Sequence, residues 1–259
     1  MARAVTEVYC ILPAMGDART GRLRAVFFDA GNTLIRMNYA AIAAELARRG
    51  VAVTADQVQR AEWRARVRLD DEVFAPASGR TSTESRDSAA RYVRLILETL
   101  GVGDETVIAG MAEWRRTHNP PVGPWDTPDP GAAPALDLLR RAGLGAAVVS
   151  NSNGAIRGIV DALGLAGRLD FVIDSSVVGV EKPDPRIFAL ALDRAGVAAR
   201  EAAYVGDLYS VDVCGARAAG LTAVLLDPGG HWGERGCPRA PDVLAAVRQL
   251  LAGAVTPAG

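Results

Sequence analysis

The stretch from residue 23 to residue 36, LRAVFFDAGNTLIR, decides how the rest of the chain is interpreted. Its short apolar run, Ala25 to Phe28, is typical of a buried strand and is followed directly by one carboxylate, Asp29. Because ligands bind outside the carboxyl ends of parallel strands, an acid at this place is a candidate active-site residue. The alternative interpretation is that Asp29 only starts a turn, since Asp, Gly and Asn all favour turns.

The composition is that of an ordinary soluble globular protein, with 49% hydrophobic and 23% charged residues among 259. The net charge of −1 gives no indication of a nucleic-acid partner. No apolar run approaches the roughly 20 residues that a membrane span requires, so we expect no membrane partner. The three cysteines, Cys10, Cys214 and Cys237, have neither paired nor metal-type spacing, which favours a reducing compartment and therefore the cytoplasm.

The chain uses arginine almost everywhere that it uses a cation. Of the 29 Lys and Arg residues, Lys182 is the only lysine. A compact ammonium on a flexible stem differs from a planar guanidinium, so Lys182 is a candidate for a site that needs this chemistry. The alternative is an ordinary surface charge, which is the usual place of a lysine.

The spacing of apolar residues changes after Arg36 and indicates an inserted helical segment. Four stretches, which include Tyr39, Ala55, Tyr92 and Val107, repeat apolar residues at helical spacing. A Pro-rich passage over 119–131 then marks a boundary. We predict the following parts: an N-terminal extension over 1–22, a core over 23–36 and 127–254, a helical insertion over 37–126 and a C-terminal tail over 255–259.

Helices and strands alternate through the second half of the chain. The predicted strands cover 145–149, 169–173, 202–205 and 222–226, with helices between them, one of them over 212–219. Such alternation is typical of an α/β fold with a parallel sheet and helices on both of its faces. We expect the strand Ala25 to Phe28 to join this sheet despite the long insertion that follows it.

Polar residues follow the predicted strands at equivalent places. Ser150 and Asn151 end one strand, Asp207 ends another, Asp212 follows five residues later, and Lys182 lies in the loop EKPDP. Each has a simpler interpretation: Ser150 and Asn151 as helix caps, Asp207 as the start of a turn, and Asp212 on a solvated helix. Their joint occurrence favours a shared site at the carboxyl edge of the sheet.

These four groups of residues resemble the motifs of the haloacid dehalogenase-like superfamily of hydrolases, over residues 24–220. FFDAGNTL resembles the first motif, VVSN the second, EKPDPRIF the third and VGDLYSVDVCGARAAG the fourth. The helical insertion resembles the helical cap of the family. The resemblance implies a Rossmann-like parallel-sheet core with an inserted α-helical cap, a requirement for Mg²⁺, and the hydrolysis of a phosphate ester.

The resemblance also implies roles for individual residues. Asp29 would be the nucleophile that forms an aspartyl-phosphate, and Lys182 would neutralise the phosphoryl oxygens. Ser150 and Asn151 would bind the substrate. The implied Mg²⁺ ligands are Asp29, the carbonyl of Gly31, Asp207 and Asp212, the last either as a direct ligand or as a support for the others. We expect a small phosphorylated substrate and a monomer or homodimer.

Gly31 departs from the pattern of the family, in which most phosphatases have a second aspartate that acts as general acid. General acid catalysis typically contributes about 10²–10⁴-fold in rate, so we expect slow turnover of alkyl phosphates. His118 is a candidate for the missing donor, against a simpler interpretation as a surface or hinge residue. Gly31 also leaves open a catalytically weak regulatory protein that binds phosphate and metal.

Two other branches of the family fit the residues less well. Haloacid dehalogenases usually have an aromatic residue at the position of Gly31 and an altered fourth motif, whereas Asp207 and Asp212 are retained here. Phosphonatases need a lysine in the cap, and residues 37–126 contain none. Within the cap, Arg60, Arg64 and Arg68 lie four apart, as candidates to meet an anionic substrate or, more simply, as a solvated helix face.

Overall fold

The structure is a computed structural model that describes residues 22–75 and 81–255. The predicted N-terminal extension and C-terminal tail lie almost wholly outside the described residues. Within these residues, every helix is too short or too polar to cross a membrane.

In the part of the chain that the structure describes, six parallel strands form one sheet at the centre of the larger unit, with the strand order β5-β4-β1-β6-β7-β8. The strands are β1 (Ala25–Phe28), β4 (Gly145–Ser150), β5 (Phe171–Asp174), β6 (Ala202–Gly206), β7 (Thr222–Leu226) and β8 (Arg239–Ala240). The predicted α/β fold with a parallel sheet is confirmed. β1 pairs with both β4 and β6, and a strand inside a parallel sheet is buried on both faces, which explains its unbroken apolar run.

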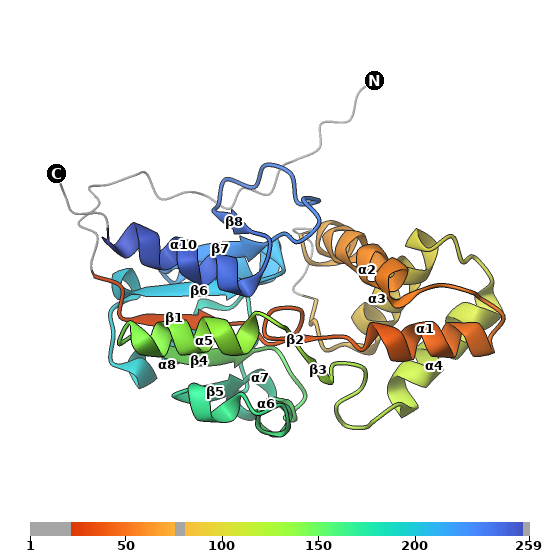
Figure 1. The fold of residues 1–259 in the computed structure, drawn as a ribbon, viewed down its shortest axis with the longest axis horizontal. Helices are drawn as coiled ribbons and strands as arrows, with labels where there is room; N and C mark the ends of the chain where they lie inside the picture. The colour runs from red at the N-terminus through yellow and green to blue at the C-terminus, as the bar shows by residue number, and fades with distance from the viewer. Residues whose placement is uncertain (1–21, 76–80, 256–259) are drawn as a thin grey trace.

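Alternate residues of β1 point to two different apolar cores. Val26 and Phe28 pack under the helices α5 (Ala132–Arg141), α6 (Ile156–Ala162) and α10 (Val243–Val255). Figure 1 shows α5 and α10 lying across this face of the sheet. Ala25 and Phe27 point to the opposite face, which α8 (Pro185–Ala195) and α9 (Cys214–Ala218) cover.

Two predicted elements have other bounds in the structure. The strand predicted over 169–173 begins two residues later, because Ala166–Arg168 form a 3₁₀ turn that ends at Leu169. The helix predicted over 212–219 is a π-type turn, η4 (Tyr209–Val213), followed by the short helix α9. The side chain of Asp212 accepts hydrogen bonds from the backbone just before η4, which ties this wider turn to the end of β6. A short helix, α7 (Ser175–Val178), follows β5.

The described part of the inserted segment, residues 37–75 and 81–126, forms a separate unit of four helices beside the carboxyl edge of the sheet (Figure 1). These helices are α1 (Tyr39–Arg48), α2 (Ala55–Leu69), α3 (Arg86–Thr99) and α4 (Glu105–Thr117), and a π-type turn, η1 (Asp70–Phe74), extends α2. A residue with a side-chain oxygen caps each helix start, which explains locally where each helix begins. The caps are Asn38, Thr54, Ser85 and Asp104.

Two very short strands join the helical unit to the sheet. β2 (Ile35–Arg36) and β3 (Thr127–Pro128) form an antiparallel pair, with Ile35 opposite Pro128 and Arg36 opposite Thr127. The chain therefore leaves the sheet and returns to it at one place. Trp125, next to this pair, packs against both the core of the helical unit and one core of the sheet.

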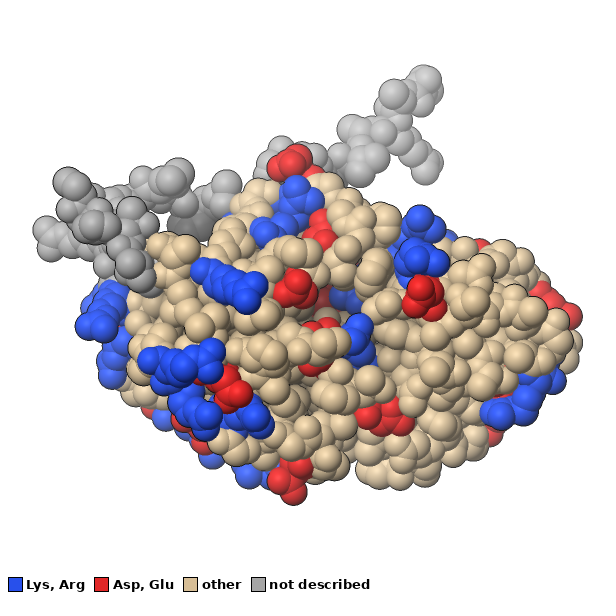
Figure 2. All heavy atoms as spheres, in the orientation of Figure 1, with Lys and Arg blue, Asp and Glu red and all other residues tan. Residues whose placement is uncertain are grey.

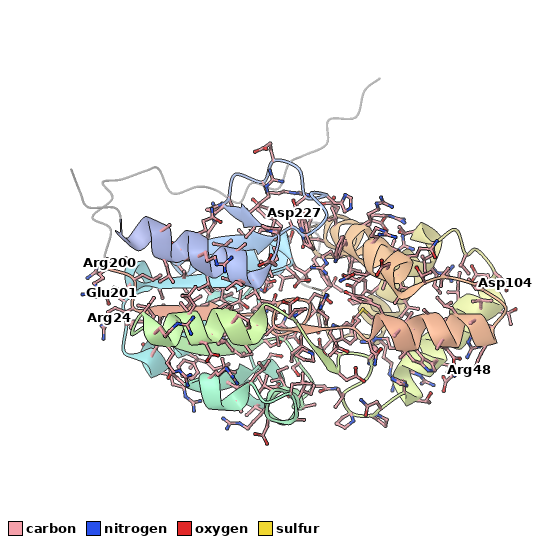
Figure 3. All side chains as sticks on the ribbon, viewed as in Figure 1. Arg24, Arg48, Asp104, Arg200, Glu201 and Asp227 are labelled. Carbon is pink, nitrogen blue, oxygen red and sulfur yellow. The ribbon has the colours of Figure 1, made fainter. Side chains whose placement is uncertain are left out.

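Charged side chains lie mainly outside these cores. Figure 2 shows basic and acidic side chains near one another over both parts of the molecule. Figure 3 shows Arg24 and Glu201 at one end of the molecule, with Arg48 and Asp104 at the other. Arg24 and Glu201 form an ion pair at 3.6 Å, far from the carboxyl edge of β1.

Candidate active site

Lys182 lies at the centre of a buried polar cluster at the carboxyl edge of the sheet. Its Nζ donates hydrogen bonds to Asp29 Oδ1 at 2.6 Å, to Asp212 Oδ1 at 2.8 Å and to the Tyr204 hydroxyl at 2.9 Å. Its side chain is only 2% exposed, so the interpretation of Lys182 as a surface charge is wrong. An ammonium has three donors, and here each of the three meets an acceptor.

The loops after β4 and α7 bring these groups together. Ser150 ends β4 and donates from Oγ to Asp29 Oδ1 at 3.2 Å. Asn151 fixes the backbone of Lys182 on both sides, because its Oδ1 accepts from Lys182 N at 2.7 Å and its Nδ2 donates to Lys182 O at 3.0 Å. The simpler interpretation of both residues as helix caps is wrong, since α6 begins after Ala155 without a side-chain cap.

Asp212 and Asp207 occupy different positions in the cluster. Both oxygens of Asp212 are engaged: Oδ1 accepts from Lys182, and Oδ2 accepts from the backbone N–H of Asp207 at 3.0 Å and of Leu208 at 2.9 Å. Asp207 instead faces the helical unit, where its Oδ2 lies 3.3 Å from Nη1 of Arg66. The geometry of Asp212 therefore suits a residue that holds the Asp207 turn.

Burial controls the electrostatics of this cluster. Burial raises the pKa of Asp29 above its usual value, and the Lys182 ammonium opposes this rise. Burial also raises the pKa of Asp207, against the effect of Arg66 and with that of the Asp29 charge. Burial alone would lower the pKa of Lys182, but Asp212 and Asp29 together raise it above its ordinary value. Lys182 therefore stays charged, and its charge favours the ionised form of Asp29.

A second buried network reaches the cluster from the helical unit, and the sequence analysis missed it. Arg66 and Glu62, both on α2, pair at 2.6 Å with side chains that are 3% and 0% exposed. Asn32 donates to the Tyr92 hydroxyl at 3.1 Å and to Asp207 Oδ2 at 3.4 Å, and the Tyr92 hydroxyl in turn bonds to Glu62. Asp207 is thus connected to α2 and α3 as well as to the sheet.

The arginines singled out from the sequence do not take part in this network. Arg60 and Arg64 are exposed, and Arg68 pairs with Glu72 and Glu98 at the surface. Because these arginines are four residues apart, all three lie on the outer side of α2. The signal for the buried pair was present in the sequence, because Glu62 and Arg66 repeat at helical spacing among apolar residues. These apolar residues are Val58, Ala61, Ala65 and Leu69.

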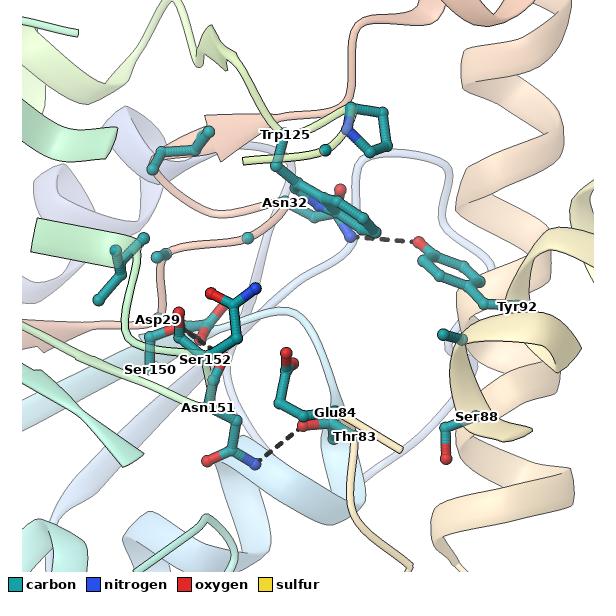
Figure 4. Close-up of a pocket in the computed structure, with 18 of the residues that line it drawn as sticks. Asp29, Asn32, Thr83, Glu84, Ser88, Tyr92, Trp125, Ser150, Asn151 and Ser152 are labelled. Atoms are coloured by element: carbon teal, nitrogen blue, oxygen red, sulfur yellow. Dashed lines mark hydrogen bonds between the residues drawn. The ribbon is translucent and has the colours of Figure 1, made fainter. Parts of the chain in front are cut away.

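A cavity of about 420 Å³ lies between the polar cluster and part of the helical unit (Figure 4). Asp29 and Ser150 line it from the sheet, and Glu84 and Tyr92 line it from the helical unit. His118 also lines the cavity. Its ring stacks on Trp114 at 4.4 Å between ring centroids, and its Nε2 is buried without a hydrogen-bond partner.

The donor atoms of the site suit a hard divalent cation. Asp29, Asp207 and the backbone between β1 and Asn32 offer only oxygen ligands, as Mg²⁺ prefers. The charge of Asp29 helps to raise the pKa of Asp207, and a cation between them would relieve this repulsion. No cluster of three or more metal-ligating side chains is formed within residues 22–75 and 81–255. Lys182 contacts Asp29 and Asp212, and Arg66 contacts Asp207.

Comparisons with known proteins relate this chain to one family of hydrolases. A family model described as haloacid dehalogenase-like hydrolase matches residues 23–220. The human haloacid dehalogenase-like hydrolase domain-containing protein 3 is 38% identical over 140 residues, which are 52% of this chain and 55% of that protein. A phosphoserine phosphatase of Thermus thermophilus is 45% identical over 101 residues, which are 39% of this chain and 41% of that protein.

Among solved structures, a 2-haloacid dehalogenase from Pseudomonas syringae is similar over 89% of this chain and 99% of its own, with 28% identity and a TM-score of 0.53. The matches with the first four curated relatives span only 38 to 55% of the length of those relatives.

Proposed function

The chain belongs to the haloacid dehalogenase-like hydrolases, and from this premise we propose that it is a phosphatase that acts on a small phosphorylated metabolite. The observation that carries this proposal is the bridge that Lys182 makes between Asp29 and Asp212. The Lys182 charge opposes protonation of the buried Asp29 at the edge of the cavity, and an ionised carboxylate is a nucleophile.

In the proposed reaction, an Asp29 oxygen attacks the phosphorus atom in line with the ester oxygen. The new P–O bond gives an aspartyl-phosphate, the P–O bond to the alcohol breaks, and water then hydrolyses the intermediate. Lys182 and Ser150 neutralise and orient the phosphoryl oxygens, because phosphoryl transfer depends mainly on position and charge. Both contact the Asp29 oxygen Oδ1, which supports this role.

Mg²⁺ is the proposed cofactor, and when bound it would offset the negative charge of the phosphoryl group. Asp29, the Gly31 carbonyl and Asp207 are the groups that would hold it. Asp212 would keep the Asp207 turn in place through its two backbone hydrogen bonds. Arg66 contacts the same Asp207 carboxylate, so its guanidinium would have to leave room for the ion.

The first test is the release of phosphate from p-nitrophenyl phosphate, with and without Mg²⁺, by the wild type and by Asp29→Asn. We expect Asp29→Asn to lower kcat by at least about 10³-fold, because the substitution removes the nucleophile. Asp161→Asn makes the same change at an exposed site on α6 and serves as the control. We expect it to keep the rate of the wild type.

Two alternatives make different predictions in this assay. A regulatory protein with a weakened site would bind phosphate and Mg²⁺, measurable by calorimetry, while the wild type released phosphate no faster than Asp29→Asn. A dehalogenase would release halide from a 2-haloacid without Mg²⁺ and leave phosphate esters intact. Activity that requires both Mg²⁺ and Asp29 would exclude both alternatives.

A further inference from the structure

The cleavage of an alkyl phosphate needs a proton donor that the cluster around Asp29 does not supply. The breaking P–O bond leaves its electron pair on an alkoxide oxygen, which is a poor leaving group until it gains a proton. Lys182 is engaged by three acceptors, and Asp29 and Asp212 share its charge. Gly31 has no side chain. The donor must therefore come from another wall of the cavity.

Glu84 is a carboxyl group on that wall. It precedes α3 and projects into the space between Asp29 and Ser152 on one side and Tyr92 on the other (Figure 4). No hydrogen bond or ion pair in the described chain reaches its carboxylate. The other acids of the helical unit that lie inward, Glu62 and Asp70, each have partners.

The segment that carries Glu84 is fastened to the loops of the sheet that form the active site. Thr83 Oγ1 accepts from Asn151 Nδ2 at 3.0 Å, and Ser82 Oγ donates to Glu181 Oε1 at 3.0 Å. Asn151 and Glu181 adjoin Ser150 and Lys182, respectively. These two bonds hold the backbone on the N-terminal side of Glu84 against the same loops that hold Asp29, which places Glu84 at the wall of the cavity beside the site.

The surroundings of Glu84 favour a carboxyl group that keeps its proton near neutral pH. Glu84 is an exposed residue that lines the cavity, and the partial desolvation of its carboxyl group there raises its pKa to about 7. The Arg115 guanidinium lowers the pKa and three carboxylates raise it. The charged groups concerned are Arg115, Glu181, Asp29 and Asp174. Lys182 and His118 line the same cavity.

We infer that Glu84 is the general acid of the proposed phosphatase, a catalytic residue supplied by the helical unit in place of the missing side chain at Gly31. As the P–O bond to the alcohol breaks, the alcohol oxygen takes the Glu84 proton and leaves as the neutral alcohol. In the second step the Glu84 carboxylate takes a proton from the attacking water. The water oxygen bonds to phosphorus, the P–O bond to Asp29 breaks, and Glu84 is protonated again.

The inference rests on the proposed function, and a comparison of leaving groups separates the two. Glu84→Gln keeps the shape of the side chain but removes the proton. We expect it to lower kcat for an alkyl phosphate by about 10²–10⁴-fold while the rate for p-nitrophenyl phosphate changes little, because p-nitrophenolate leaves without a proton. Glu105→Gln, the same change at an exposed site on α4, is the matched control and should alter neither rate.

The pH profile and a second variant complete the test. The wild-type rate on the alkyl phosphate should fall as pH rises above about 7, since Glu84 then loses its proton, and Glu84→Gln should lack this limb. Gly31→Asp in the Glu84→Gln background should restore part of the lost rate, because a Cβ at Gly31 meets its nearest neighbour, Trp125 Nε1, at an ordinary 3.4 Å.

Equal losses of Glu84→Gln on both substrates, or no loss on either, would overturn the inference and leave the proposed function standing. A wild type that cleaves neither ester would overturn both.

Discussion

Lys182 shows most clearly how one side chain organises this site. In a chain that otherwise uses only arginine, the exception lies where three oxygen atoms approach one buried cation. A guanidinium is planar and larger, and it cannot direct three donors to acceptors around a single nitrogen atom. The geometry of this site thus explains why the chain has a lysine, and not another arginine, at residue 182.

We expect Lys182→Arg to fold with lower stability and to lose most of its activity. Overpacking of a buried site typically costs about 1–3 kcal/mol, so the melting temperature should fall. The kcat should fall by about 10²-fold or more, because the charge that faces the phosphoryl oxygens is displaced. Thermal unfolding and phosphate release measure the two effects.

The reciprocal change on the surface is the control for this substitution. Arg140→Lys alters a side chain that is 68% exposed and should change neither stability nor rate. A Lys182→Arg variant with the activity of the wild type would show that the ammonium geometry is unimportant.

The sequence predicted the residues of the cluster that come from the sheet, but not the residues of the helical unit that contact them. Asp29, Ser150, Lys182, Asp207 and Asp212 could be found because each follows a buried strand or lies in a loop at the same sheet edge. Their catalytic and binding roles remain predictions. The partners from the helical unit could not be found in this way, because the approach of α2 to Asp207 depends on how two separate cores pack together.

At the scale of elements, long periodic segments were predicted and short ones were missed. The helical spacing predicted for the stretch that includes Ala55 corresponds to α2, Ala55–Leu69. β2, β3 and β8 have two residues each and show no period of their own. Their pairing is fixed by neighbours that are distant in the sequence. The π-type turn η4 could not be predicted from the sequence either, because its backbone conformation depends on hydrogen bonds to the side chain of Asp212.

η1 and η4 meet through a buried carboxyl group, Asp70. Its Oδ1 accepts from Ser210 N at 3.0 Å, and its Oδ2 accepts from Ser210 Oγ at 2.8 Å. Burial raises the pKa of Asp70 to about 7 from an ordinary 3.8, although both hydrogen bonds lower it. The contact joins the helical unit to the turn that follows Asp207.

This contact predicts a pH-dependent stability that Asp70→Asn should remove. Between pH about 4 and 7 the folded state holds a proton on Asp70 that the unfolded state releases, so stability falls as pH rises through this range. Each unit of pKa difference corresponds to about 1.4 kcal/mol. We expect melting temperatures of Asp70→Asn to decline less than those of the wild type from pH 4 to pH 7.

Asp104→Asn provides the comparison, since asparagine caps a helix as well as aspartate does. It should keep the pH slope of the wild type. The same slope in Asp70→Asn would show that the pKa of Asp70 does not differ between the folded and unfolded states.

At the scale of the whole molecule, polar contacts hold two separately packed units together over the cavity. Arg66 reaches Asp207, Asp70 reaches Ser210, and Arg235 in the loop after β7 donates to Asp71 at 2.8 Å. The two units have distinct apolar cores that share Trp125. Separation of the units should therefore break few apolar contacts and several charged ones.

We expect the double variant Glu62→Gln with Arg66→Met to open more often than the wild type. It removes the bond to Asp207 without leaving an unpaired charge in the helical unit. Hydrogen exchange of the amides that face the cavity in α2 and α3 should quicken by roughly tenfold to a hundredfold, as for charge-assisted bonds worth about 1.5–3 kcal/mol.

The amides of β1 and β4 provide the reference within the same experiment, because they belong to the sheet and should exchange at the rate of the wild type. Arg60→Met, an exposed substitution on α2, controls for the loss of a charge. Uniform acceleration across the sheet and the helices would instead indicate global destabilisation.

The paired strands β2 and β3 have a further consequence, for the segment that they enclose. Because the chain departs and returns through adjacent backbone, with Arg36 opposite Thr127, the segment between them can change in length without displacing the strands of the sheet. Its content is constrained where it touches the site, as at Arg66 beside Asp207. A change in this segment can therefore alter what enters the cavity while the strand that ends at Asp29 stays as it is.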